Sequence, residues 1–305
     1  MPRCLLAFAT LLMVAAGACG GAGNGSADSS GRVIAAFYPL EFVAGEIVGS
    51  ANVTNLSPPG IEPHDLELSP SQVRSLSQAD LVVFVGDGFQ PAVEEVIGQL
   101  QGTPSIDALE TQDELLEAAD SPEDEGVDDE GEVGASDPHV WLDPKRLASL
   151  GHAIAREMAK IDSDNADVYG DNAEGLEDAL DKLDEEYSTA LENCERNELV
   201  VSHEAFGYLT ERYGLEQIGV SGIDPESEPS PGRVAEVAGF AREHGVTTIF
   251  FEEQVPPDIA QVIADEIGAE VEVLDPLEFE PEDDSDYFDV MRNNLDSIST
   301  ALGCN

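Results

Sequence analysis

Short apolar runs alternate with amphipathic segments along most of this chain. Five runs are rich in β-branched and aromatic residues, as is typical of strands buried on both faces of a sheet. They are residues 32–38, 80–86, 197–203, 246–252 and 269–275. Segments with helical spacing lie between and after them, at residues 69–79, 204–214, 230–245 and 256–268. Because strands that alternate with helices pair in parallel, the pattern predicts an α/β fold with mostly parallel sheets flanked by helices.

Two longer helical segments, residues 143–161 and 164–194, separate the two groups of strands. The second has an apolar stripe with mainly three- and four-residue steps, formed by Val168, Leu176, Leu180, Leu183, Tyr187 and Leu191. At ~1.5 Å per residue such a helix is long enough to run the height of the protein. We therefore expect an N-terminal α/β lobe at 32–160, one long linking helix at 161–195 and a C-terminal α/β lobe at 196–305.

A strongly acidic segment interrupts the first lobe. Residues 110–137 contain thirteen acidic side chains and no Lys or Arg. The last part has too few apolar residues to pack, which predicts a mobile loop. Two interpretations remain open. The carboxylates could collect divalent cations loosely, or the segment could be a solvated insertion that is acidic like the rest of the surface.

The N-terminus has the features of an export signal. Arg3 precedes an apolar run that is too short to span a membrane, and small residues then lead to Cys19. The stretch Ala16-Gly17-Ala18-Cys19 resembles a bacterial lipobox, in which the cysteine is lipidated. We expect a signal peptide at 1–18 and a flexible Gly/Ser tether at 19–31. This predicts an exported membrane lipoprotein that faces the outside or the periplasm.

The remaining cysteines fit an oxidising compartment. With Cys4 removed and Cys19 lipidated, only Cys194 and Cys304 are left. Two thiols in such a compartment can form a disulfide, which would tie the C-terminus to the start of the second lobe. The alternative is two separate buried thiols, and the sequence does not choose between them.

The charge of the chain restricts its partners. Its 305 residues include 13 Lys and Arg against 64 Asp and Glu, a formal net charge of −51. A polyanion would be repelled by nucleic acid, so we exclude a general nucleic-acid binder, and the charge also disfavours docking onto anionic lipid head groups. Cations remain as the natural small ligands. The hydrophobic fraction of 42% is sufficient for real cores, so the acidity does not imply global disorder.

Three of the five histidines lie where ligands bind in parallel sheets. His64 is in a proline-rich turn before a helix, His139 follows the acidic segment, and His203 ends a strand. Asp275 and Glu278 come at the end of another strand. Three imidazoles and a carboxylate are a suitable shell for a first-row divalent ion such as tetrahedral Zn²⁺. Taken singly, each could also be an ordinary structural histidine, as we expect for the two others, His152 and His244.

The residues around these histidines resemble the metal-binding receptors of bacterial zinc and manganese ABC importers, a group of periplasmic proteins and lipoproteins. The matching stretches, in chain order, are IEPHDLELSPSQ, DPHVWLDP, VVSHEAFGYLTERYGL, DPESEPSPGRV, FFEEQV, LDPLE and YFDVMRNNLDSISTAL. The resemblance covers about residues 32–303. It implies two α/β lobes joined by a long helix, with the metal between them, held by His64, His139, His203 and Asp275. Glu278 is an alternative or additional ligand.

The resemblance implies a receptor that captures Zn²⁺, with Mn²⁺ as the alternative, and delivers it to an ABC permease without catalysing a reaction. We expect a monomer anchored through Cys19. The long helix would limit hinge motion, so opening would come from shifts of C-lobe loops. Relatives often carry a His-rich loop before the second ligand, whereas the corresponding segment here is acidic and has no histidine.

Two rival functions fit part of the same pattern. A His₃ zinc hydrolase would need a general base near the metal, and Glu204 and Glu62 are the neighbouring acids. A metal-binding surface adhesin is the other rival, although no repeat or adhesive patch is visible. A receptor differs from both in closing its metal shell with protein ligands and having no turnover.

Overall fold

The computed structural model describes residues 32–100, 102–118, 136–225, 227–252, 258–281 and 285–305. The predicted signal peptide, the tether with Cys19, and residues 119–135 of the acidic segment lie outside the described residues. No helix in the described part of the chain combines the length and apolar character that crossing a membrane requires.

The first sheet has four described strands in the order β2-β1-β3-β4, all parallel. They are β1 (Val33–Ala35), β2 (Val53–Asn55), β3 (Leu81–Phe84) and β4 (Ser105–Asp107). The helices of this lobe are α1 (Tyr38–Val48), α2 (Pro70–Leu76) and α3 (Pro91–Gln99). Ser69 caps α2 with its side chain and Pro70 occupies the first turn, so the start of this helix is where the sequence predicts it.

The second sheet repeats this arrangement with the order β6-β5-β7-β8, again parallel throughout. Its strands are β5 (Glu198–Val201), β6 (Glu216–Gly219), β7 (Thr248–Phe251) and β8 (Glu270–Val273). Its helices are α6 (Gly207–Tyr213), α7 (Pro231–His244), α8 (Asp258–Ile267) and α9 (Tyr287–Leu302). The predicted α/β class with two parallel sheets is confirmed.

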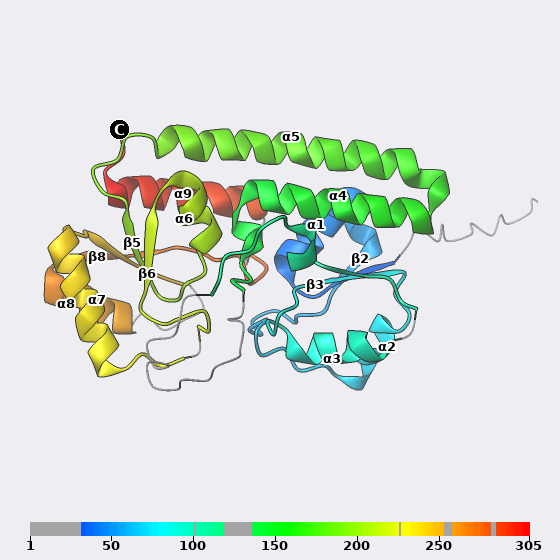
Figure 1. The fold of residues 1–305 in the computed structure, drawn as a ribbon, viewed down its shortest axis with the longest axis horizontal. Helices are drawn as coiled ribbons and strands as arrows, with labels where there is room; N and C mark the ends of the chain where they lie inside the picture. The colour runs from blue at the N-terminus through cyan, green and yellow to red at the C-terminus, as the bar shows by residue number, and fades with distance from the viewer. Residues whose placement is uncertain (1–31, 101, 119–135, 226, 253–257, 282–284) are drawn as a thin grey trace, which may run out of the picture.

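Two long helices lie across the molecule. Helix α4 (Pro144–Ile161) ends at a 3₁₀ turn (Ser163–Asn165), and α5 (Ala166–Ala190) then returns antiparallel to it. Figure 1 shows α5 passing over both lobes, with α4 beneath one half and α9 beneath the other. The Tyr187 hydroxyl of α5 donates a hydrogen bond to the carbonyl oxygen of Met291 in α9 at 2.5 Å. The long helix thus lies against α4 and is bonded to α9 of the second lobe.

The apolar stripe of α5 is mostly buried, as its spacing predicts. Leu176, Leu180, Leu183 and Tyr187 are at most 3% exposed, but Val168 is 52% exposed. Position 168 points away from the buried face of the helix, and the neighbouring Tyr169 lies on that face instead. The largest buried cluster includes side chains from both sheets and from α5, so it joins the two lobes, and a second, smaller cluster lies within the second lobe.

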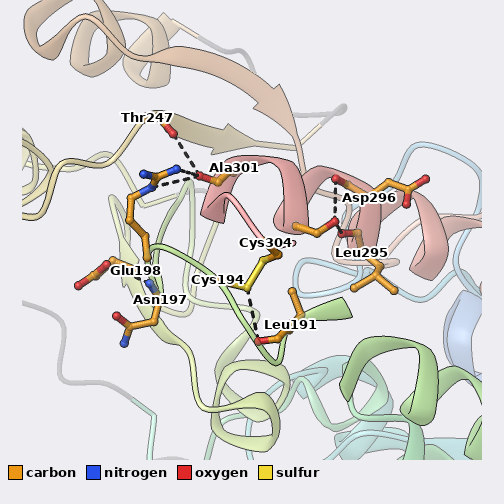
Figure 2. Close-up of a disulfide and its surroundings, with 11 residues drawn as sticks. Leu191, Cys194, Asn197, Glu198, Thr247, Leu295, Asp296, Ala301 and Cys304 are labelled. Carbon is orange, nitrogen blue, oxygen red and sulfur yellow. Dashed lines mark hydrogen bonds between the residues drawn. A yellow bond between two sulfur atoms is a disulfide. The ribbon is translucent and has the colours of Figure 1, made fainter. Parts of the chain in front are cut away.

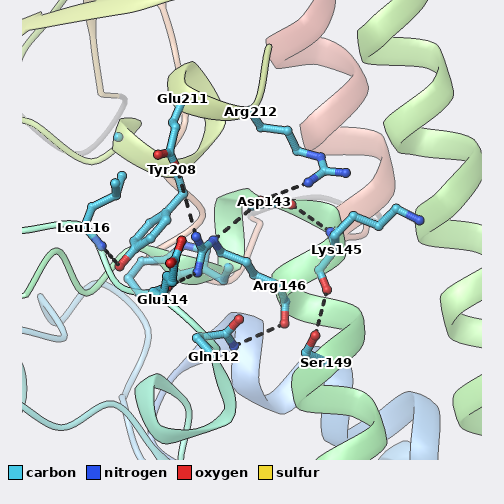
Figure 3. Close-up of polar contacts among 12 residues, drawn as sticks. Gln112, Glu114, Leu116, Asp143, Lys145, Arg146, Ser149, Tyr208, Glu211 and Arg212 are labelled. Carbon is cyan, nitrogen blue, oxygen red and sulfur yellow. Dashed lines mark hydrogen bonds and ion pairs between the residues drawn. The ribbon is translucent and has the colours of Figure 1, made fainter. Parts of the chain in front are cut away.

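Helix α6 of the second lobe is bonded to the start of α4 (Figure 3). The Arg146 guanidinium lies 4.3 Å from the centre of the Tyr208 ring and donates to the carbonyl oxygen of Glu114 at 2.6 Å. Arg212 lies 3.5 Å from the Asp143 carboxylate. A cation over an aromatic face and a half-buried ion pair both favour a fixed arrangement of the two lobes here.

Cys194 and Cys304 are joined in a disulfide (Figure 2). Cys194 follows α5 and Cys304 follows α9. The backbone N–H groups of Glu195 and Arg196 donate to the carbonyl oxygen of Leu302, at 3.0 and 3.1 Å. Of the two states that the sequence leaves open, the structure has the bonded one, and it closes the C-terminal helix onto the end of α5.

Candidate metal centre

The predicted histidines come together at the carboxyl ends of strands from both sheets. His203 is two residues beyond the end of β5, and His64 lies in the irregular segment between β2 and α2. His139 directly precedes a 3₁₀ turn (Val140–Leu142) that leads into α4. Glu278 follows β8. These strand ends face the same space because parallel strands present their carboxyl ends at one edge.

The side chains of His64, His139, His203 and Glu278 each offer one ligand atom, and all four atoms lie within 4.8 Å of one another. Glu278 Oε1 is 3.5 Å from Nε2 of His64, 3.3 Å from that of His139 and 3.4 Å from that of His203. The His139, His203 and Glu278 side chains are at most 1% exposed, and that of His64 is 14% exposed. A cation can therefore be surrounded by protein on nearly all sides.

The converging atoms are polar, buried and unpaired. The three Nε2 atoms and both carboxylate oxygens of Glu278 have no hydrogen-bond partner among the described residues. Buried polar atoms in folded proteins almost always have a partner, because an unpaired one costs about 1–3 kcal/mol. Unpaired atoms that converge from three imidazoles and one carboxylate indicate a bound cation that accepts an electron pair from each of these four side chains, as a divalent metal ion does.

Two of the imidazoles are oriented by carboxylates behind them. Nδ1 of His139 is 2.8 Å from Asp137 Oδ1, and Nδ1 of His203 is 2.6 Å from Glu252 Oε1. A carboxylate that accepts the Nδ1 proton leaves the Nε2 lone pair free for a metal. The His64 ring packs instead against Phe89, with ring centres 4.3 Å apart.

In the metal-free state, the surroundings of this centre favour protonated His139 and His203 imidazoles beside an ionised Glu278 carboxylate. Burial opposes protonation of His203, but the charges of Glu252 and Glu278 raise its pKa well above the usual value. Burial also opposes protonation of His139, but the hydrogen bond to Asp137 and the nearby Glu278 carboxylate raise its pKa. Burial alone would raise the pKa of Glu278, yet the neighbouring imidazoles hold it well below its ordinary range. A bound metal ion must therefore displace protons from the imidazoles.

A cavity lies beside the segments that carry the proposed ligands. It has a volume of about 900 Å³, and its lining includes Glu62, two residues before His64, and Ser202, which directly precedes His203. Three further acidic residues line it, Asp65, Glu228 and Asp258. The concentrated negative charge attracts cations toward the centre, although salt screens this attraction over ~8–10 Å.

Comparison with known proteins assigns the family. Residues 33–301 match the family described as "Zinc-uptake complex component A periplasmic". The chain belongs to this zinc-uptake family. The match spans both lobes and the linking helix, so the resemblance predicted from the motifs is confirmed, and the family is one of transport receptors rather than enzymes.

Individual relatives agree with this. The chain is 35% identical to the high-affinity zinc uptake system protein ZnuA of Bacillus subtilis, over 96% of this chain and 95% of the relative. The zinc-bound structure of AdcA from Streptococcus pneumoniae matches with a TM-score of 0.74 and 30% identity, over 90% of this chain and 58% of that one. This chain therefore spans a little more than half the length of AdcA.

A third relative has an additional activity. The laminin-binding protein Lmb of Streptococcus agalactiae has a TM-score of 0.78 and 31% identity, over 89% of this chain and 99% of that chain. It is described as a bifunctional protein with adhesin and metal-transporting activity.

The sequence offers two acids, Asp275 and Glu278, as the fourth ligand. In the fold of this zinc-uptake protein, Glu278 is the one that lies with the three histidines. Asp275 Oδ1 accepts a hydrogen bond from the backbone N–H of Leu277 at 2.7 Å, and Asp275 is not part of the convergent group. Leu277 has a φ of 60°, in the left-handed region. The Asp275 carboxylate therefore supports a tight turn, and the turn directs Glu278 inward.

The two acids weighed as general bases have other contacts. Glu204 Oε1 accepts from the backbone N–H of Gly219 at 3.3 Å and lies 3.7 Å from Arg233. Glu62 Oε1 accepts from the backbone N–H of His64 at 3.3 Å, and burial together with the charge of Glu278 raises its pKa to about 8. Each of the two carboxylates thus accepts a hydrogen bond from a backbone N–H group.

Sequence reasoning missed Asp137 and Glu252, which lie behind two of the imidazoles. Both had a detectable signal. Asp137 is two residues before His139, and Glu252 ends the predicted strand 246–252 at the same sheet edge as His203. Acids at the edge where ligands gather can support a ligand as well as serve as one.

Proposed function

We propose that this protein is an extracytoplasmic receptor that captures Zn²⁺ at His64, His139, His203 and Glu278 and delivers it to an ABC permease. The observation that carries this proposal is the group of buried, unpaired ligand atoms contributed by both lobes. Membership of the zinc-uptake family supports the direction of transport and the partner.

The donor set favours Zn²⁺ over the alternative Mn²⁺. Three imidazole nitrogens and one carboxylate are typical ligands of a four-coordinate zinc ion, whereas Mn²⁺ prefers more oxygen ligands. Asp275, the acid that would add a second carboxylate, is engaged in the turn at Leu277. The zinc-bound state of the AdcA relative is consistent with this choice.

The location follows from the family and from the N-terminal sequence. Proteins of this family are exported. We further propose that residues 1–18 are removed and that Cys19 carries the lipid anchor, with residues 19–31 as the tether. A relative 31% identical to this chain, from Streptococcus pneumoniae, is named a zinc-binding lipoprotein. We propose that the anchored receptor acts as a monomer.

Titration of metal-free protein with Zn²⁺ tests the proposed site. Wild-type protein should bind one tight equivalent, and His203→Ala should lose most of the affinity. His152→Ala is the matched control, because this imidazole pairs with Glu177 on the helical layer, outside the centre. Equal zinc affinity of His203→Ala and His152→Ala would show that the site is elsewhere.

A further inference from the structure

Glu252 is a buried acid in contact with one of the proposed ligands. It directly follows β7, which neighbours β5 in the sheet, and β5 leads to Ser202 and His203. The Glu252 residue is 3% exposed. Its Oε1 accepts from the Ser202 hydroxyl and lies 2.6 Å from Nδ1 of His203. Two adjacent strand ends thus bring an acid and a ligand together that are 49 residues apart in the chain.

The stability of the fold does not explain why residue 252 carries a carboxylate. A buried carboxylate is expensive unless its oxygens are paired, and Glu252 Oε2 has no partner in the described part of the chain. Its contacts, all through the other oxygen, are with the ligand His203 and with Ser202, which precedes it. A neutral side chain of the same size would fill the space at lower cost, which indicates that the charge acts on His203.

The contact determines what His203 offers to the centre. With the proton on Nδ1 and shared with Glu252, Nε2 carries a lone pair, and this is the nitrogen that lies 3.4 Å from Glu278 Oε1. A negative partner on Nδ1 also makes Nε2 a stronger electron-pair donor. In the opposite tautomer the Nε2–H would point at the metal position and block coordination.

We propose that Glu252 is a positioning residue for metal capture: its carboxylate holds His203 in the Nδ1–H form and strengthens the Nε2–metal bond. The inference rests on the proposed zinc site. Glu252 would then do for His203 what Asp137 does for His139, namely accept the Nδ1 proton. The difference is that Asp137 lies two residues from its histidine, whereas Glu252 comes from another strand.

Glu252→Gln removes the charge and keeps the size. Outer-shell substitutions of this kind weaken metal affinity by about 10- to 100-fold, so we expect a loss in that range. Glu204→Gln is the matched control, since Glu204 is also buried and adjacent to His203 in sequence but bonds Gly219 and Arg233. It should bind zinc within about threefold of wild type.

A spectroscopic measurement separates positioning from general support of the fold. In the zinc-loaded protein, the Nδ1 proton shared with Glu252 should give a downfield proton resonance that is absent in His203→Ala. Glu252→Gln should shift or lose this resonance, and Glu204→Gln should retain it. Glu252→Asp is a second variant for the case in which Glu252→Gln does not fold. It keeps the charge, but its side chain is one methylene too short to reach Nδ1 of His203, so it should also weaken zinc binding.

The outcomes distinguish this inference from the function on which it rests. Loss of zinc by His203→Ala, together with wild-type affinity and an unchanged resonance in Glu252→Gln, would overturn the role of Glu252 alone. Unchanged zinc affinity in His203→Ala would overturn the zinc site itself.

Discussion

Trp141 Nε1 donates a hydrogen bond to the carbonyl oxygen of Pro276 at 2.7 Å, and both residues are buried. Trp141 is two residues after His139, and Pro276 is two residues before Glu278. The Trp141 carbonyl oxygen in turn accepts from the Tyr287 hydroxyl at 2.7 Å. The segments that carry two proposed ligands from different lobes are thus bonded directly to each other, independently of any metal.

Trp141→Phe should therefore weaken both the fold and the metal centre. The smaller ring leaves a gap and leaves the Pro276 carbonyl without its donor, which costs about 1–3 kcal/mol for the unpaired group alone. Denaturant unfolding of the metal-free protein measures this loss, and zinc titration should show weaker binding. Tyr287→Phe provides the comparison, since it removes the hydrogen bond from Tyr287 to the Trp141 carbonyl oxygen and leaves the one from Trp141 to Pro276. Wild-type stability in Trp141→Phe would show that this bond contributes nothing.

The two acids near the C-terminal strand should differ sharply in their effect on zinc. Glu278→Gln removes the anionic ligand, and we expect its affinity to fall by more than about 100-fold, beyond the loss typical of outer-shell changes. Asp275→Asn keeps an oxygen that can accept from the Leu277 N–H, so its affinity should remain within about threefold of wild type. Competition with a zinc indicator measures both. The reverse order would identify Asp275 as the ligand.

Zinc affinity should rise with pH and then level off. In the metal-free protein the raised pKa values of His139 and His203 mean that protons occupy the imidazoles up to a pH above their ordinary value of 6.5. Zinc must displace these protons, so its affinity falls as pH decreases through that range. Isothermal titration in buffers of different ionisation enthalpy counts the protons released. No proton release near pH 6.5 would contradict the prediction.

The stability of the metal-free protein should change in the opposite direction. A raised imidazole pKa in the folded state contributes stability that is complete below the unfolded pKa near 6.5 and is lost as pH rises through the folded value. The depressed pKa of Glu278 contributes stability above about 4.5 that is lost as pH falls through its folded value. Metal-free protein should thus melt at lower temperature as pH rises above about 6.5, while the stabilisation by zinc grows. A parallel rise in both melting temperatures would contradict this.

Reduction of the Cys194–Cys304 disulfide should destabilise the fold with little effect on zinc. The bond spans 110 residues of sequence, and closing a loop of that size is worth on the order of 4–5 kcal/mol in the chain-entropy model. The disulfide follows the ends of α5 and α9, whereas the four proposed ligands lie in the segments that follow β2, β4, β5 and β8. Denaturation with and without reductant, beside a Cys194→Ser, Cys304→Ser double variant, measures the loss. A large fall in zinc affinity after reduction would show coupling that these contacts do not explain.

The sequence predicts the central strands of the two sheets better than the edge strands. The runs at 32–38, 80–86, 197–203 and 246–252 correspond to β1, β3, β5 and β7, the central strands of the two sheets. The strands that the pattern missed, β2, β4 and β6, are all at sheet edges and have three or four residues. Edge strands are exposed on one side, so they lack the continuous apolar run that identifies a buried strand.

The candidate site shows a similar division. The three histidines are identifiable because their residue type and their place at strand or loop ends agree. The choice between Asp275 and Glu278 depends on the left-handed backbone of Leu277, which apolar spacing does not reveal. Glu252 contacts His203 only because β7 and β5 are neighbours, and strand order is a property of the sheet rather than of either segment.

X-ray absorption at the zinc edge of protein loaded with one equivalent tests the central claim most directly. The account predicts a four-coordinate ion with three imidazole nitrogens and one carboxylate oxygen at about 2.0–2.2 Å. One imidazole should disappear from the spectrum of His203→Ala, if that variant is loaded at high zinc. A shell of oxygen atoms alone, as acidic residues 110–137 would provide, would contradict the account.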